Sequence, residues 1–320
     1  MRRLIYKALL FLAILVLLDG LIGLGLRKMF FANRSGAPGY VLNHLMDKPY
    51  DAYIMGASGA QRGYVPAVLQ QELGISVFNT GEAGTNIFHN YAALQLILEH
   101  HKPKLIIWDL TNADYYYRPD ASKTGMISPY YRQAAIYKML LDIQPLNRFW
   151  FMSKTYPYNQ KVLSIASTFL HKPATEVMGD NGYHPLYTVF QPQEHDNPLG
   201  LYYEELASTK KRSKEEQKQD LLIRKYFHAF IQLCQENNIK LIAFHCPKAP
   251  LNSEVASTPL VSAELKAQLT MHNIPLYCIM PSQYPSMQNL KLYYDFSHLN
   301  HAGATEYSKI IATKLQSELR

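Results

Sequence analysis

The chain has 320 residues, of which 48% are hydrophobic and 18% are charged. This composition excludes a mainly disordered protein, because disordered chains have low hydrophobicity and high net charge. Its formal net charge of +7 is concentrated at the N-terminus, where residues 1–34 carry six basic side chains against Asp19, so no basic face for nucleic acid is expected elsewhere. The three cysteines, Cys234, Cys246 and Cys278, form no CxxC pair, which excludes a disulfide scaffold and a thiolate zinc site.

The N-terminal segment is predicted to enter a membrane. Residues 4–26 are almost entirely apolar, and as a helix they would span about 30 Å, the thickness of a bilayer core. Two interpretations are open, a cleaved signal peptide and an uncleaved anchor. The apolar run continues past Asp19 with no small-x-small cleavage motif before Arg27, which favours the anchor. Arg2 and Arg3 precede the run, which favours an N-terminus inside and a body outside the cytoplasm.

The body is predicted to be one α/β domain at residues 51–320, joined to an anchor at 1–28 by a linker at 29–50. Apolar runs bounded by turn residues predict five strands, at residues 51–55, 75–79, 104–110, 240–245 and 274–279. Helices are predicted between and after them, at residues 66–73, 87–101, 213–237, 261–272 and 301–319. Strands that alternate with helices in this way predict a parallel sheet wrapped on both faces.

A long irregular stretch interrupts this alternation. Residues 115–211 are rich in Tyr, Pro, His and Asn, and the stretch is too long for a bare loop. We interpret it as an insertion that carries helices at 133–141 and 160–170. It is expected to pack aromatic side chains over the functional site.

The residues that follow the strands carry the candidate chemistry, because ligands of such sheets bind beyond the carboxyl ends of the strands. Ser58 follows the first strand in a glycine turn, and Asp295 and His298 stand just before the last helix. A serine hydroxyl needs a base to remove its proton, which His298 can supply, and Asp295 can orient the imidazole. The developing oxyanion needs N–H donors, which we assign to the backbone of Ser58 and Gly84 and to the side chain of Asn112.

Each candidate also has a purely structural interpretation. Ser58 can satisfy backbone donors at a helix start, and Gly84 can be an ordinary turn glycine. Asp295 and His298 can be an ion pair at the entry of the last helix, and Asn112 can be an ordinary loop asparagine. Arg62 and His184 are further candidates for substrate contact, although Arg62 can instead pair with Glu82, and His184 can be a plain loop residue. No metal and no cofactor are expected, because the sequence has no HExxH motif and no phosphate-binding glycine motif.

The order of these residues resembles the sequence blocks of the SGNH (GDSL-type) hydrolase superfamily, from about residue 51 to the C-terminus. The residues that match its serine, glycine and Asp-x-x-His blocks are Ser58, Gly84, Asp295 and His298. Two positions depart from the pattern. Ala57 replaces the Asp of Gly-Asp-Ser, and Asn112 lacks the flanking Gly and Asp of the third block.

The resemblance implies a three-layer flavodoxin-like sandwich with a central parallel five-stranded sheet, and ester hydrolysis or O-acyl transfer through a Ser-His-Asp triad. With its anchor, the chain resembles the extracytoplasmic branch that modifies the acyl groups of envelope glycans. We therefore expect an acylated glycan or another small ester as substrate.

Either water or a sugar hydroxyl can accept the acyl group, because both fates share one site. A transferase would also need an acyl-donor partner in the membrane. The alternative from another class is a catalytically inactive SGNH-fold subunit that binds glycan or scaffolds an envelope assembly. The altered third block favours that alternative.

Overall fold

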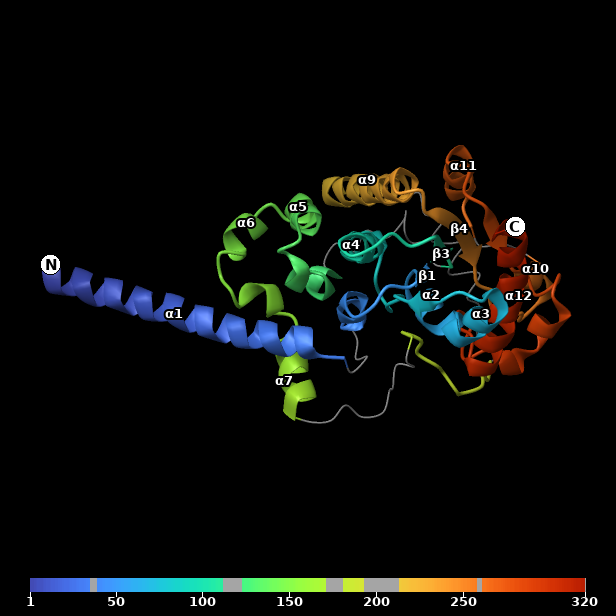
Figure 1. Ribbon diagram of the computed structural model, residues 1–320, viewed down its shortest axis with the longest axis horizontal. Helices are drawn as coiled ribbons and strands as arrows, with labels where there is room; N and C mark the ends of the chain where they lie inside the picture. The colour runs from blue at the N-terminus through green and yellow to red at the C-terminus, as the bar shows by residue number, and fades with distance from the viewer. Residues whose placement is uncertain (35–38, 112–122, 171–180, 193–212, 258–260, 320) are drawn as a thin grey trace.

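Five short parallel strands form the centre of the fold, in the spatial order β2-β1-β3-β4-β5. The computed structural model describes residues 1–34, 39–111, 123–170, 181–192, 213–257 and 261–319. Helices pack around the sheet, and one long N-terminal helix extends from the body (Figure 1). The predicted α/β class with a five-stranded parallel sheet is confirmed. The strands are β1 (Ala52–Met55), β2 (Val77–Asn79), β3 (Leu105–Asp109), β4 (Lys240–His245) and β5 (Leu276–Cys278).

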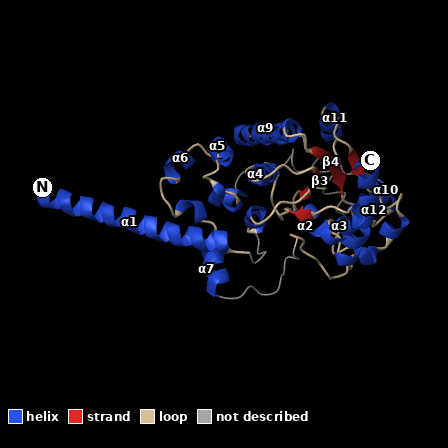
Figure 2. Ribbon diagram, in the orientation of Figure 1, coloured by secondary structure: helices blue, strands red, loops and turns tan. Residues whose placement is uncertain are grey.

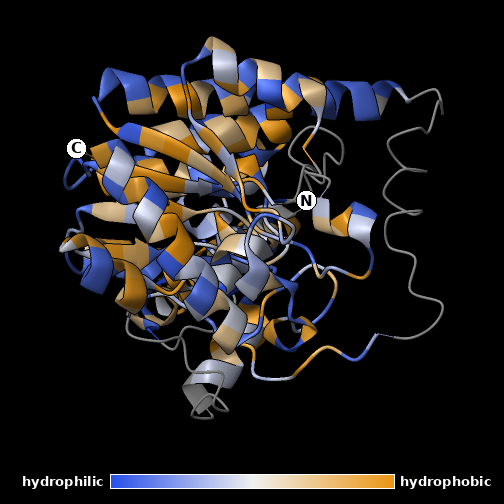
Figure 3. Ribbon diagram, turned by 90° about the vertical axis from the view of Figure 1, so that its right-hand side faces the viewer, coloured by the Kyte–Doolittle hydropathy of each residue, from blue (hydrophilic) through white to orange (hydrophobic). Residues whose placement is uncertain are grey.

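Both faces of the sheet are covered by apolar side chains. Successive side chains of a strand point to opposite faces, so Tyr53 and Met55 of β1 join one hydrophobic cluster while Ala52 and Ile54 join another. Helices α4 and α9 contribute to the first cluster, and α2, α3 and α12 to the second. Figure 2 shows the strands inside the body, and Figure 3 shows hydrophobic residues concentrated on them. These helices, with the N-terminal one, are α1 (Arg2–Ala32), α2 (Ser58–Gly63), α3 (Pro66–Leu73), α4 (Ile87–Leu98), α9 (Lys214–Glu236) and α12 (His301–Leu319).

Local sequence signals explain where several helices begin. Pro66 occupies the first turn of α3, where its missing N–H has no intrahelical partner to lose. Ser213 and Glu216 form a capping box at the start of α9, in which each side chain bonds the other residue's backbone. The side chain of Asn300 accepts a 3.1 Å hydrogen bond from the Gly303 N–H and so caps α12.

The predicted and observed bounds agree for α3, β4 and α12, whereas β2 and α4 are shorter than predicted. Strand β2 begins late because the Ser76 N–H and hydroxyl bond the Asp51 carboxylate, at 3.0 and 2.7 Å. Helix α4 ends at Leu98, before His101, because the His100 N–H turns back to the carbonyl of Ile97, three residues earlier, at 3.0 Å, which tightens and closes the last turn.

Helix α1 has the length and hydropathy of a membrane-spanning helix or of a signal sequence. It is not free along its whole length, since Asp19 joins it to the body. The Asp19 carboxylate accepts hydrogen bonds from the Ser153 hydroxyl (2.7 Å), the Lys154 N–H (2.6 Å) and the Thr155 hydroxyl (2.7 Å). A Cβ on Gly23 would lie 2.5 Å from the Lys154 Cβ, so glycine permits this close approach. The second half of α1 is therefore held against the body by the hydrogen bonds of Asp19 and by the close contact at Gly23.

The predicted linker at 29–50 contributes to the core where the structure describes it, and its first residues, up to Ala32, belong to α1. Phe30, Tyr40 and Leu42 are almost fully buried in the cluster that also holds α4 and α9. A 3₁₀ helix, η1 (Val41–Met46), carries part of this packing. The connection from α1 to the sheet is thus a packed one.

Residues 123–170 of the insertion form short helices; α7 (Val162–Leu170) and η5 (Tyr156–Tyr158) contact α1, whereas α5 (Ala134–Ile143) contacts α4 and α9 (Figure 1). Helices appear near both predicted positions, and a third, α6, was not predicted because a four-residue helix leaves no periodic pattern. The remaining described elements are α5 (Ala134–Ile143), α6 (Asn147–Trp150), α7 (Val162–Leu170), α10 (Ser253–Ser257), α11 (Ala263–Met271), η3 (Lys123–Met126), η4 (Ser128–Tyr130), η5 (Tyr156–Tyr158), η6 (Pro285–Gln288) and η7 (Leu290–Leu292).

Candidate active site

A sharp turn after β1 presents Ser58 at the carboxyl edge of the sheet. The turn begins at Gly56, whose φ is +156°. A Cβ on Gly56 would lie 2.8 Å from the Cβ atoms of both Ala60 and Asp109, so a larger residue does not fit without displacement. The chain reverses within these few residues, and Ser58 becomes the first residue of α2.

A second tight turn, just before α12, holds the histidine. The Tyr294 N–H donates to the carbonyl of His298, at 2.9 Å, which closes the turn. One carboxylate oxygen of Asp295, Oδ1, accepts the backbone N–H groups of Ser297 (2.7 Å) and His298 (2.8 Å). The carboxylate therefore shapes the turn that carries the imidazole.

The two turns meet, although Ser58 and His298 are 240 residues apart in sequence. The Nε2 atom of His298 lies 2.9 Å from the Ser58 Oγ, and Nδ1 lies 2.9 Å from Oδ2 and 3.0 Å from Oδ1 of Asp295. A carboxylate beside Nδ1 holds the proton there, which leaves the lone pair of Nε2 free to accept the serine proton. The side chains of His298 and Asp295 are 25% and 41% exposed, so the serine–histidine–aspartate arrangement is open to solvent.

The electrostatics of this arrangement favour an ionised aspartate. Burial raises the pKa of Asp295, but its hydrogen bonds to the His298 side chain, and those from the Ser297 and His298 backbone, outweigh burial and lower the pKa overall. The negative charge is therefore retained where it can stabilise an imidazolium.

The glycine block lies directly beside the serine turn. The Glu82 N–H donates to the carbonyl of Gly56, at 3.3 Å, and a Cβ on Gly81 would lie 2.5 Å from the Gln61 nitrogen. Gly84 follows in the same loop, exposed and with a φ of +72°, a conformation that glycine adopts without strain.

Asn112, the third expected oxyanion donor, lies outside the described residues. The described chain of β3 and its extension ends at Thr111, at the same edge of the sheet. The contribution of Asn112 therefore stays a prediction.

Arg62 lies in α2, and His184 lies beside that helix. Arg62 and Glu82 do not form a salt bridge in the described part of the chain. Burial raises the pKa of Glu82, and the positive charge of Arg62 is one of the effects that lower this pKa. The His184 N–H donates to the carbonyl of Gln61, at 3.2 Å, and its side chain is buried. This places the 181–192 segment of the insertion against α2, with the Tyr183 hydroxyl 3.2 Å from the His301 Nδ1.

Asp109 is a site residue that the sequence analysis missed. It ends β3 beneath the serine turn, where its carboxylate accepts a 2.9 Å hydrogen bond from the Tyr64 hydroxyl and another from the Thr111 hydroxyl. The Thr111 oxygen in turn accepts the Cys246 N–H, at 2.9 Å. Burial raises the pKa of Asp109 to about 6, although both hydroxyls act to lower it. The signal in the sequence was a lone carboxylate that closes an otherwise apolar strand.

The packing around Asp109 ties the serine turn to the sheet. A Cβ on Gly59 would lie 2.5 Å from the Asp109 carboxylate, so α2 rests directly on this group. We therefore regard Asp109 as a positioning residue.

No protein-family model matches this sequence, and neither does any curated protein. Interpretation of the site thus depends on its geometry. Among the described residues, no group of three or more His, Cys, Asp or Glu side chains is placed to hold a metal ion. What the geometry provides is an alcohol, an imidazole and a carboxylate in hydrogen-bonded series, which is the arrangement needed for nucleophilic attack on an acyl carbon.

Proposed function

We propose that the chain is a serine esterase or O-acyltransferase of the SGNH type. The observation that carries this proposal is the 2.9 Å separation of the Ser58 Oγ and the His298 Nε2, with Asp295 against the other ring nitrogen. Such a series of three groups recurs on several unrelated folds among enzymes in which serine performs acyl transfer.

In the proposed first step, the Ser58 Oγ attacks the acyl carbon of an ester while its proton passes to the His298 Nε2. The negative charge that develops on the former carbonyl oxygen is held by the N–H groups of Ser58 and Gly84 and by Asn112. The tetrahedral intermediate collapses when the C–O bond to the alcohol breaks and His298 returns the proton to the departing oxygen. An acyl-serine ester remains.

In the proposed second step, His298 removes a proton from an incoming hydroxyl, and that oxygen attacks the acyl carbon of the acyl-serine. The bond between the acyl carbon and the Ser58 Oγ then breaks, and His298 returns the proton to that oxygen, which restores the free serine. Water gives a free acid and a sugar hydroxyl gives a new ester, so one site serves both outcomes. Asp295 keeps the imidazole in its orientation throughout and stabilises the imidazolium.

The fold supports an assignment to a three-layer flavodoxin-like sandwich. The strand order of the sheet is the flavodoxin-like 2-1-3-4-5, and its order reverses between β1 and β3. Ligands bind at such a switch point, and Ser58 directly follows β1. The fold is thus consistent with membership of the SGNH superfamily, which the sequence blocks first indicated.

We further propose that α1 anchors the protein in a membrane with the body outside the cytoplasm, and that the substrate is an O-acylated glycan. The exposed apolar side chains along the first eighteen residues of α1 support the anchor. The open position of His298 and Asp295 supports a large substrate, since a polymer cannot enter a closed cavity.

The proposal is tested with a fluorophosphonate probe, which forms a covalent bond with an activated serine. We expect labelling of the full chain and no labelling of the Ser58→Ala or His298→Ala variants. Ser257→Ala, which alters an exposed serine on α10, is the matched control and should label like the wild type. Equal labelling of Ser58→Ala would contradict the assignment of the nucleophile.

A second assay separates the two reactions. An acyl donor is supplied with and without a glycan acceptor, and the products are acylated glycan or free acid. A folded wild-type chain that binds glycan without probe labelling would instead support the inactive binding or scaffolding subunit.

A further inference from the structure

Four large apolar side chains are exposed together around α6. They are between 51% and 74% exposed, which is unusual for one short stretch of a soluble surface. We call residues 146–155 the α6 lobe. Its exposed apolar side chains are Leu146, Phe149, Trp150 and Met152.

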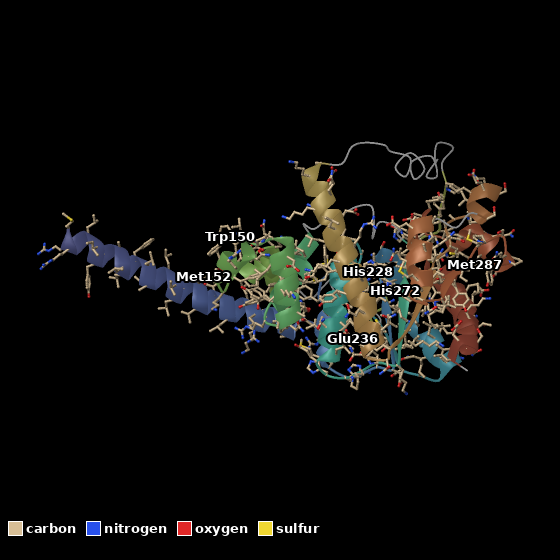
Figure 4. All side chains as sticks on the ribbon, turned by 90° about the horizontal axis from the view of Figure 1, so that it is seen from above. Trp150, Met152, His228, Glu236, His272 and Met287 are labelled. Atoms are coloured by element: carbon tan, nitrogen blue, oxygen red, sulfur yellow. The ribbon has the colours of Figure 1, made fainter. Side chains whose placement is uncertain are left out.

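The α6 lobe is attached to α1. Ser153 and Thr155 donate to the Asp19 carboxylate, and the backbone of Lys154 packs on Gly23. In Figure 4, Trp150 and Met152 lie at the end of the body from which α1 extends. Leu18, the neighbour of Asp19 in α1, is also exposed, so the lobe joins α1 where α1 itself presents apolar side chains.

Basic residues cluster at the C-terminal part of α1 and mark a position along the helix axis. Arg27 and Lys28, with Arg132 of the insertion, line a groove of about 850 Å³ between α1 and the body. Asp19 precedes Arg27 by eight residues, which is about 12 Å of helix. Arg and Lys lie at the headgroup level of membranes, so the lobe is joined to α1 on the apolar side of these cations, the side toward the acyl chains.

The lobe has the composition of a membrane-interface segment. Tryptophan gathers where the bilayer meets water, and the Trp150 ring stacks on Tyr156, with centroids 5.7 Å apart. The guanidinium of Arg148 lies 5.6 Å from the centre of the Phe149 ring, so a cation borders the apolar surface.

We propose that the α6 lobe inserts into the bilayer interface beside α1, so that the body is held on the membrane at two contacts. The proposal rests on the membrane anchor of the proposed function. The occupant is lipid, because the lobe continues the surface with which α1 itself meets the acyl chains. Since Asp19 bonds the two elements, the lobe and α1 enter the membrane as one unit.

The chain contains only two tryptophans, which makes the proposal directly testable. Trp108 is fully buried in β3, whereas Trp150 is half-exposed in the lobe. The full-length protein is reconstituted in phosphatidylcholine vesicles that contain brominated acyl chains. We expect bromine to quench the Trp150 emission by about twofold or more, since tryptophan prefers this interface. The Trp150→Phe variant should lose this quenching while the Trp108 emission is unchanged.

A matched pair of variants supplies the control, both made on the Trp150→Phe background. Met152→Trp places the reporter in the lobe, and Met271→Trp places it on α11, at a similarly exposed methionine. We expect brominated lipid to quench Met152→Trp only, and aqueous iodide to quench Met271→Trp only. The proposal is overturned if both variants respond to iodide alone, or if Trp150 is shielded from both quenchers, as a covering protein would do.

Probe labelling of Ser58 on the same vesicles separates this proposal from the proposed function. Labelling without lipid quenching overturns the lobe insertion and leaves the enzyme assignment intact. Lipid quenching without labelling overturns the enzyme assignment and leaves the lobe insertion intact. A chain that is washed off the vesicles overturns the anchor and the lobe insertion together.

Discussion

Replacement of Asp295 by Asn tests how the imidazole is prepared for catalysis. The Oδ1 atom of Asp295 accepts two backbone N–H groups, from Ser297 and His298, while Oδ2 faces the Nδ1 of His298. An amide oxygen can take over the two backbone bonds, which leaves the amide NH₂ facing Nδ1. An NH₂ group can only donate, so Nδ1 must become the acceptor and the ring proton must move to Nε2. The protonated Nε2 then faces Ser58 and can no longer take its proton.

The expected loss is large because the variant traps the wrong tautomer. We expect kcat for hydrolysis of a nitrophenyl ester to fall by about 10⁴-fold, or about 5 kcal/mol in the activation barrier. Initial rates would be measured for the wild type, Asp295→Asn and the control Asp47→Asn, which alters an aspartate outside the site. Circular dichroism would verify that all three chains are folded. A loss smaller than about tenfold in Asp295→Asn would refute the orienting role of this carboxylate.

Three further predictions concern stability. The pKa of Asp109 is raised to about 6 from its ordinary 3.8, so its ionisation in the folded state opposes folding as the pH rises from about 4 to 6. Asp109→Asn should remove this dependence and reduce the difference in unfolding free energy between pH 4 and pH 7 by about 2 kcal/mol in urea titrations; an unchanged pH profile would contradict the raised pKa. Gly56→Ala should lower the unfolding free energy by about 1–3 kcal/mol and weaken probe labelling, since its Cβ would meet Ala60 and Asp109; a variant with wild-type melting and labelling would show that the turn tolerates a side chain. Asp19→Ala should cost about 1–2 kcal/mol and speed proteolysis of the insertion, because Ser153 loses its acceptor; equal digestion rates would argue against docking through Asp19.

The sequence allowed the main architecture to be predicted because its signals are local. Strand β4 and helices α3 and α12 have the predicted bounds. Their apolar runs and 3.6-residue periodicity depend only on neighbouring residues, so the sequence is enough to locate them. The meeting of Ser58 with His298 could also be anticipated, because the topology of a parallel sheet brings the ends of its strands to one edge.

Other features depend on contacts between distant segments and left no pattern to find. The docking of Asp19 joins residues 134 and more positions apart, and the linker carries Tyr40 into the core. The Asp109 network depends on where Tyr64 and Cys246 meet in space. In each case the partner of the side chain could be named only from the fold.

The central claim is that Ser58 is an activated nucleophile. It is tested most directly by peptide mass spectrometry of the full chain after fluorophosphonate treatment. We predict a single covalent adduct, located on Ser58 and absent when His298 is replaced by Ala. An untouched Ser58, or an adduct that forms equally well without the imidazole, would contradict the proposed mechanism.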